Sequence, residues 1–231
     1  MEAYRETFDD GPGGWYGYAD LPGQIKHALE WEPGRLTSRS PWWIDYNHAP
    51  PGVGYFHMLF CLHTRGPLED AIMDAGGHNR YISGGFPACM SDARVTVRSR
   101  GELYAQGAKV SMLVQGMVDG ICSGWVLTAD TFDIGEDWGE QTITLDPDPD
   151  RWTALGSRYN RTDTYGVKPL DKVLKLDVVN IMLLLFPIDV VPMGPIEGDM
   201  HRLRPGREYP VWRHKLPEGY VTLDEVRMEF P

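Results

Sequence analysis

The chain has 231 residues, of which 33 are Asp or Glu and 22 are Lys or Arg, so its formal net charge is −11. This charge repels phosphate backbones and anionic membrane surfaces, and no basic cluster reverses it locally, so neither nucleic acid nor a membrane is expected as a partner. Hydrophobic residues make up 42% of the chain, which is enough for a globular core. No run reaches the roughly 18 consecutive apolar residues that a membrane helix needs.

The start of the chain, MEAYRETFDDG, lacks the basic beginning and apolar middle of a secretory signal. Unless a signal was removed ahead of it, this predicts a cytoplasmic protein. Three cysteines, Cys61, Cys89 and Cys122, form an odd and widely spaced set without a Cys-x-x-Cys pair. Free thiols are therefore expected rather than disulfides or a zinc site.

The first half of the chain predicts three strands and one helix. Tyr4–Phe8 alternates between apolar and polar residues, and a turn rich in Asp and Gly follows it. Leu36–Ile44 is expected to form a second strand, and Tyr55–Leu62, apolar on both faces, a central one. Pro67–Ala75 has apolar residues at helical spacing, which predicts a short surface helix.

In the second half of the chain apolar and polar residues alternate with a period of two, as they do in half-buried antiparallel strands. Strands are predicted around Val95 and Val97, around Val110 to Val114, and at Gly124–Thr128, Gln141–Leu145, Asn180–Phe186 and Tyr220–Phe230. Leu170–Leu176 is a helix candidate. About nine strands with short connections predict an all-β antiparallel sandwich or jelly roll with two or three short surface helices. We expect one domain over 1–231, with a long loop insertion at about 187–215.

The stretch Ser40–Leu62, SPWWIDYNHAPPGVGYFHMLFCL, joins a polar aromatic segment to the central strand through a stiff Pro-Pro-Gly turn. Sugars combine hydroxyl rims with apolar C–H faces, so their sites pair flat aromatics with carboxylate, amide and guanidinium groups. Adjacent strand residues point to opposite faces, so one of Trp42 and Trp43 is expected to be the stacking platform. The predicted polar contacts are Asp45, Asn47, His48, Arg98, Gln115 and Arg161.

Structural explanations remain open for the same residues. The tryptophans can be core residues, as a Trp beside a strand often is. The residues from Asp45 to His48 can form a tight turn in which side chains bond their own backbone. Arg98 and Gln115, on the polar sides of neighbouring predicted strands, can belong to a solvated face with weak ion pairs.

Three segments resemble carbohydrate-binding jelly-roll modules of the galactose-binding-like type. They are FDDG with the following Gly-Trp at Phe8–Trp15, FDIGEDWGEQTITL at Phe132–Leu145, and LDEV at Leu223–Val226. The resemblance implies the sandwich fold, recognition of a saccharide or other small polar ligand, and a structural calcium between the first and last strands. Glu6, Asp9 and Asp224 occupy the matching positions, although Asp224 can equally be a strand-edge charge.

A carbohydrate-active enzyme, either a polysaccharide lyase or a glycoside hydrolase, is the competing interpretation. Its acid/base would be His48 or His57, with Tyr46 as a second catalytic candidate. His57 and His63 are six residues apart and so are expected to share one strand face with Leu59 and Cys61, where two imidazoles could hold a metal.

The chain carries no P-loop or dinucleotide fingerprint, so no nucleotide cofactor is expected. A third interpretation is a structural subunit that uses its apolar strands to form a homodimer.

Overall fold

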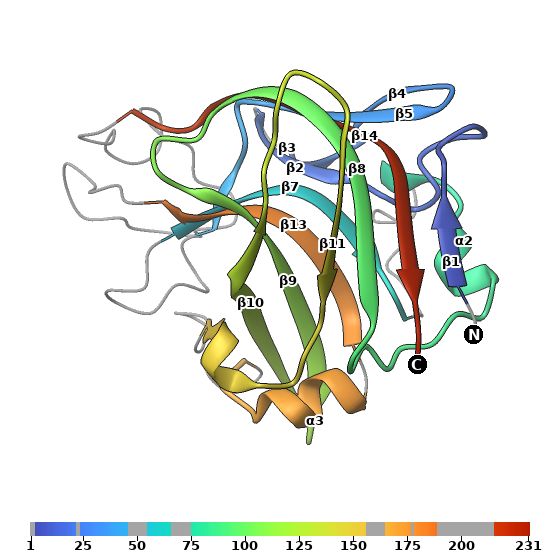
Figure 1. The fold of residues 1–231 in the computed structure, drawn as a ribbon, viewed down its shortest axis with the longest axis vertical. Coiled ribbons are helices and arrows are strands. Elements are labelled where there is room, and N and C mark those ends of the chain that lie inside the picture. The colour runs from blue at the N-terminus through green and yellow to red at the C-terminus, as the bar shows by residue number, and fades with distance from the viewer. Residues whose placement is uncertain are drawn as a thin grey trace.

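The computed structural model describes residues 3–21, 24–45, 55–65, 75–155, 165–176, 178–188 and 215–231. Within these ranges, fourteen strands form two antiparallel six-stranded sheets and one two-stranded ribbon, β2 (Gly17–Leu21) with β3 (Gln24–His27). Figure 1 shows the two sheets as overlapping layers, with both termini at one edge of the molecule. The predicted antiparallel β-sandwich is confirmed.

We call the first layer the β8 sheet. Its strand order is β11–β8–β14–β5–β4, and β1 pairs with the last residues of β14. Its strands are β1 (Ala3–Glu6), β4 (Glu30–Glu32), β5 (Arg35–Arg39), β8 (Arg94–Tyr104), β11 (Gly139–Thr144) and β14 (Glu218–Glu229).

We call the second layer the β9 sheet, with the order β12–β10–β9–β13–β7–β6. Its strands are β6 (Ile44–Asp45), β7 (Tyr55–His63), β9 (Lys109–Val118), β10 (Ile121–Phe132), β12 (Trp152–Ala154) and β13 (Val178–Ile188). Further along β7, the backbone of Tyr16 pairs with Cys61. The segment leading into β2 therefore continues the edge of the sheet that β6 begins.

Short helices close the ends of the sandwich. The α2 helix (Arg80–Ser83) begins at Asn79, whose side chain accepts a hydrogen bond from the Ile82 N–H. The α3 helix (Leu170–Lys175) confirms the predicted helix there and packs against β9 and β13. A 3₁₀ turn, η1 (Pro149–Arg151), precedes β12. Among the described residues no helix is long and apolar enough to cross a membrane.

Two earlier predictions fall largely outside the description. Of the helix predicted at Pro67–Ala75, only Ala75 is among the described residues. Of the loop predicted at about 187–215, only the two ends are. Cys61, Cys89 and Cys122 form no disulfide with one another.

Apolar side chains lie on both faces of the β9 sheet. One cluster fills the space between the two sheets, and a second, smaller cluster includes Cys61, Met182, Leu113 and Val126. These four residues face one another across β7, β13, β9 and β10, and the residues next to them along each strand point into the first cluster. The second cluster therefore occupies the outer face of the β9 sheet.

Candidate functional site

The paired tryptophans point to opposite faces, as predicted, but neither ring is exposed. Trp42 is 2% exposed and faces the core between the sheets, where its indole N–H donates to Ser38 Oγ at 2.9 Å. Trp43 is 3% exposed and belongs to the cluster on the outer face of the β9 sheet, 5.7 Å from the Tyr18 ring. The structure thus corrects the expectation of a solvent-facing tryptophan platform, because both rings are packed within the protein.

Four predicted site residues, Tyr46, Asn47, His48 and Arg161, lie outside the described residues. Asp45 ends β6, where its backbone pairs with Phe56, and its side chain also lies outside the description. The roles assigned to these five residues remain predictions.

Arg98 and Gln115 do not lie on the same face of the sandwich. Their strands, β8 and β9, are consecutive in the chain but belong to different sheets. Arg98 projects from the outer face of the β8 sheet, where it pairs with Asp224, and Gln115 from the outer face of the β9 sheet. The prediction that placed them on neighbouring polar strands is wrong, because the chain crosses from one sheet to the other between Tyr104 and Lys109.

The two histidines of β7 also lie on opposite faces. The pairing of β7 with β13 slips by one residue between Met58 and Phe60, which forms a β-bulge and shifts the alternation of side chains. His57 therefore points into the core, fully buried beside Trp42, and His63 points outward. The expected pair of metal-binding imidazoles on one face is corrected accordingly.

His57 is unsuited to acid/base work. Burial lowers the pKa of its imidazole to about 4, so the ring is neutral at physiological pH. Its Nδ1 bonds the Trp43 carbonyl oxygen at 3.2 Å, and its buried Nε2 has no hydrogen-bond partner in the ranges that the structure describes. Of the two histidines of this strand, His63 is the better candidate.

Six uncharged polar or aromatic residues gather on the outer face of the β9 sheet, and we call them the aromatic–polar row. Gln115, Asn180 and His63 face one another across β9, β13 and β7. Tyr16 continues the row at the sheet edge. The members are Gln115, Asn180, His63, Tyr16, Tyr18 and Trp43.

The centre of the row is a hydrogen-bonded Tyr–His pair. The Tyr16 hydroxyl lies 2.7 Å from His63 Nε2, and the two rings stack within 11° of parallel. The Cys61 thiol donates to the same hydroxyl at 3.1 Å, so we assign the phenol proton to the bond with His63. Burial, together with the nearby Cys61 and Tyr18, raises the pKa of the Tyr16 phenol well above its ordinary value. The phenol is therefore a donor at neutral pH.

The amide end of the row contains a buried acceptor without a partner. Asn180 is 8% exposed and Gln115 is 6% exposed. Within the described part of the chain Asn180 Oδ1 makes no hydrogen bond, an unusual state for a buried polar atom. Sequence inspection did not select Asn180 or Tyr16 as site residues, although a lone Asn within the apolar run VVNIMLLL was a usable signal.

The three predicted calcium ligands do not fit a shared site. Glu6 is 3% exposed and forms a bidentate pair with Arg80, at 2.5 and 2.7 Å. Arg80 also donates to the backbone carbonyls of Asp10 and Gly11, so this pair fixes the opening turn. Gly13 lies so close that a Cβ there would stand 2.0 Å from Glu6 Oε2, which is why the turn needs glycine.

Asp224 lies on the opposite side of its sheet from Glu6. It sits at a bulge in β14 and pairs with Arg98, whereas Glu6 faces the interior. Asp9 accepts a hydrogen bond from Thr7 at 2.7 Å. Among the described residues, no three His, Cys, Asp or Glu side chains are grouped so that they could hold a metal.

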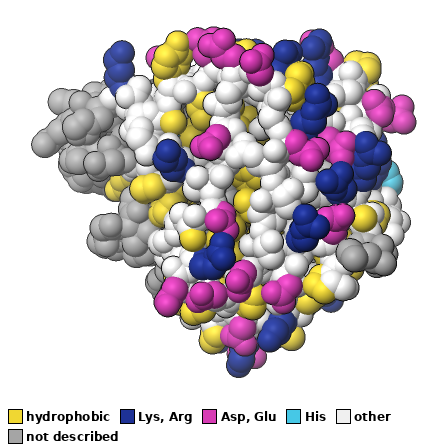
Figure 2. Space-filling view, in the orientation of Figure 1, with side chains coloured by type: hydrophobic (Ala, Val, Ile, Leu, Met, Phe, Trp, Pro, Cys, Tyr) yellow, Lys and Arg dark blue, Asp and Glu magenta, His cyan; other side chains and the backbone are white. Residues whose placement is uncertain are grey.

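The outer face of the β8 sheet has a different chemistry. Arg98 and Arg100 lie 5.2 and 4.8 Å from the Trp138 ring centroid. Figure 2 shows basic and acidic side chains next to one another on the face that carries β8, β11 and β14, without a broad region of either sign. A hollow of about 310 Å³ at one end of this face is lined by Arg39, Tyr104 and Tyr220, among others.

Comparisons with known proteins leave the family open. No family model matches the chain, and no curated protein matches its sequence. Among solved structures, the L4b domain of human laminin alpha-2 matches over 99% of this chain and 98% of that chain, with a TM-score of 0.41 and 7% identity. We therefore infer the function from the site geometry.

Proposed function

We propose that the aromatic–polar row binds a neutral, hydroxyl-rich ligand, namely a saccharide or sugar derivative. The observation that carries this proposal is Asn180 Oδ1, a buried acceptor between Gln115 and His63 that has no hydrogen-bond partner among the described residues. A ligand hydroxyl that donates to this oxygen removes the cost of leaving it unpaired.

The composition of the row supports an uncharged ligand. It offers two amides, two phenols and an imidazole, which can donate to and accept from hydroxyl groups. None of its members is an Asp, Glu, Lys or Arg. Tyr18, which is only partly buried, adds aromatic surface of the kind that packs against the C–H faces of sugars. The resemblance of three segments to galactose-binding-like modules points to the same ligand class.

Titration calorimetry with neutral and acidic oligosaccharides tests the proposal. We expect a neutral sugar to bind, and Asn180→Ala to weaken its binding by about ten-fold, the value of one hydrogen bond to a buried group. His63→Gln should weaken it similarly, whereas His78→Gln, on the exposed turn before α2, is the matched control and should have no effect. Absence of binding across a broad panel, or equal losses in the row and control variants, would contradict the proposal.

The Tyr16–His63 pair supports a second candidate, a polysaccharide lyase. In such a reaction a base removes the proton beside a uronate carboxylate, and amide groups stabilise the resulting anion. His63 and Tyr16 are placed to exchange a proton at 2.7 Å, and Gln115 and Asn180 lie beside them. The row has no pair of carboxylates, so it offers no support for the usual two-carboxylate mechanism of glycoside hydrolases.

Tyr16→Phe distinguishes the two candidates, because it removes the hydroxyl and keeps the ring. A lyase should lose at least about 100-fold in kcat with little change in KM, since general acid–base groups contribute about that much. If the protein only binds sugars, neither the wild type nor the variant should raise the absorbance at 235 nm, where an unsaturated lyase product absorbs, with any uronate polymer.

A further inference from the structure

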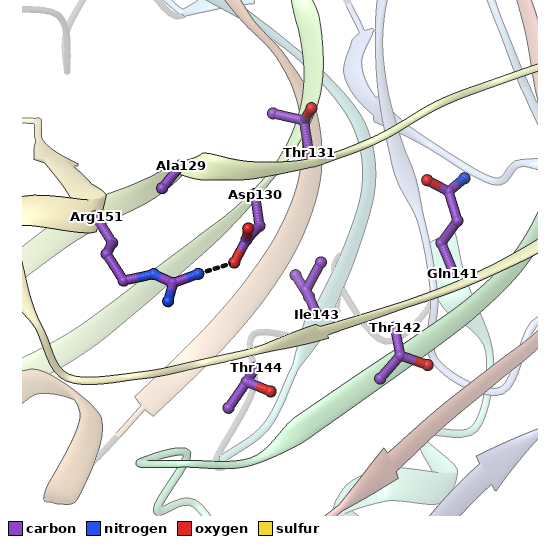
Figure 3. A pocket seen from close by; sticks show the side chains of 8 residues that line it. All are labelled: Ala129, Asp130, Thr131, Gln141, Thr142, Ile143, Thr144 and Arg151. Carbon is purple, nitrogen blue, oxygen red and sulfur yellow. Dashed lines mark hydrogen bonds and ion pairs between the residues drawn. The ribbon is translucent and has the colours of Figure 1, made fainter.

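A polar groove opens where the two sheets diverge, between β10 and β11. Its volume is about 580 Å³, and its walls include Asp130 and Thr131 from β10, Thr142 and Ile143 from β11, and Arg151 from η1. Figure 3 shows Arg151 reaching across one end of the groove to Asp130 while β11 runs along the opposite wall. None of these residues belongs to the aromatic–polar row.

The groove exists because β10 leaves its neighbour for part of its length. Leu127 pairs with Met112 and Phe132 with Val110, so the four residues between them on β10 bulge out of the sheet. The strand on the other side, β12, pairs with β10 only as far as Leu127. The bulged segment therefore stands away from the body of the β9 sheet.

The facing wall is an open strand edge. β11 is the last strand of the β8 sheet and pairs with β8 over all six of its residues. In the described part of the chain, no strand pairs with its other side. An edge of this kind presents unpaired backbone N–H and C=O groups, which can pair with a further strand.

The chain segment that contains this edge is acidic, while Arg94 and Arg98 on the neighbouring strand β8 lie opposite Thr144 and Glu140. Residues 130–151 contain eight Asp or Glu and one basic residue, Arg151, a net charge of −7 within a chain of −11. Arg151 is already paired with Asp130 and lies 3.8 Å from Asp146. The acidic residues are Asp130, Asp133, Glu136, Asp137, Glu140, Asp146, Asp148 and Asp150, all at least partly exposed.

We propose that the free edge of β11 accepts an extended, basic peptide segment of a partner protein as an added strand. Backbone pairing along β11, where alternate residues direct their N–H and C=O groups to the free side, supplies the register, and the groove provides room for the side chains on one side of the peptide. Charge complementarity selects lysine and arginine in the partner. A second copy of this chain is disfavoured at this edge, because pairing like edges would oppose two segments of net charge −7.

The competing explanation is that the acidic residues serve only to prevent strand pairing, as charges on edge strands often do. The two explanations differ in one respect. A protective edge repels every added strand, whereas a docking edge binds a strand of the opposite charge through its backbone.

Fluorescence anisotropy with a labelled, capped hexapeptide that alternates lysine with valine and threonine tests the proposal on the full chain. We expect this peptide to bind, and two control peptides to fail. In one, glutamate replaces lysine. In the other, alternate backbone amides are N-methylated, which keeps the charge but removes one row of donors. Hydrogen exchange of the Gly139–Thr144 amides should slow when the basic peptide is present.

Paired charge variants locate the site. Glu136→Gln with Glu140→Gln should weaken binding by about ten-fold, since two opposite charges near the peptide are lost. Asp171→Asn with Glu218→Gln removes the same charge from exposed positions elsewhere and should change the affinity by less than about two-fold. Absence of binding, equal binding of the N-methylated peptide, or equal losses in the two double variants would each overturn the proposal.

Discussion

The two outer faces of the sandwich differ in the charge and the burial of their polar residues. On the β8 sheet they are charged and largely exposed, and pairs such as Arg94 with Glu229 lie at the surface. On the β9 sheet the residues of the aromatic–polar row include no Asp, Glu, Lys or Arg, most of them are buried, and they border an apolar cluster. Surface ion pairs contribute little to stability. Buried amides and phenols must find partners, so they point to a site.

A comparison of two tryptophans should show the largest difference between the faces. Trp43→Ala removes a ring that is 3% exposed and should lower the free energy of unfolding by about 3–5 kcal/mol. Trp138→Ala removes a partly exposed ring that contacts Arg98 and Arg100 on the other face, and should cost only about 1 kcal/mol. Urea unfolding measures both, and equal losses would contradict the distinction between the two faces.

The pH dependence of stability should reveal the inward-facing histidine. His57 has a pKa of about 4 when folded and about 6.5 when unfolded, so the unfolded state binds the proton first as the pH falls. The contribution of the neutral His57 to the free energy of unfolding is complete above pH 6.5. It falls by about 3 kcal/mol as the pH is lowered to 4.

The variant His57→Phe should therefore lose less stability between pH 6.5 and 4 than the wild type. Parallel slopes for the wild type and His57→Phe, measured by urea unfolding at several pH values, would show that the imidazole is not buried as described.

The smallest effect is expected on the charged face. Arg98→Ala removes the pair with Asp224 and should cost about 1 kcal/mol or less, because the Arg98 side chain is 43% exposed. Arg94→Ala, on the same face of β8 and 60% exposed, is the matched control and should cost less. Thermal melting at low and high salt measures both. A loss above about 2 kcal/mol for Arg98→Ala would make this pair a structural element rather than a surface one.

Much of the fold could be predicted from sequence because local alternation determines it. The strands of the β8 sheet alternate apolar and polar residues, as at Val95 and Val97, since one face meets the core and the other meets water. The helix at Leu170–Lys175 also follows from its spacing. The short strands β4 and β12 escaped prediction because each has only three residues, and the single strand predicted at Leu36–Ile44 is divided between β5 and β6, which belong to different sheets.

The candidate site was only partly predictable because its members come from distant segments. Gln115 and Trp43 were selected from sequence, but Tyr16 and Asn180 join them only through strand pairing. The prediction that His57 and His63 share one face of β7 was wrong because a one-residue bulge in this strand directs His57 inward. Periodicity alone cannot reveal a bulge.

The sequence by itself determined that this chain forms an antiparallel sandwich with a strong negative charge, because alternation and composition are local properties. Only the tertiary structure decided which sheet each strand joins. That decision separated Arg98 from Gln115, paired Glu6 with Arg80, and placed His63 against Tyr16. The physical reason is that hydrogen bonding between strands far apart in sequence, together with single-residue bulges, determines which side chains share a face.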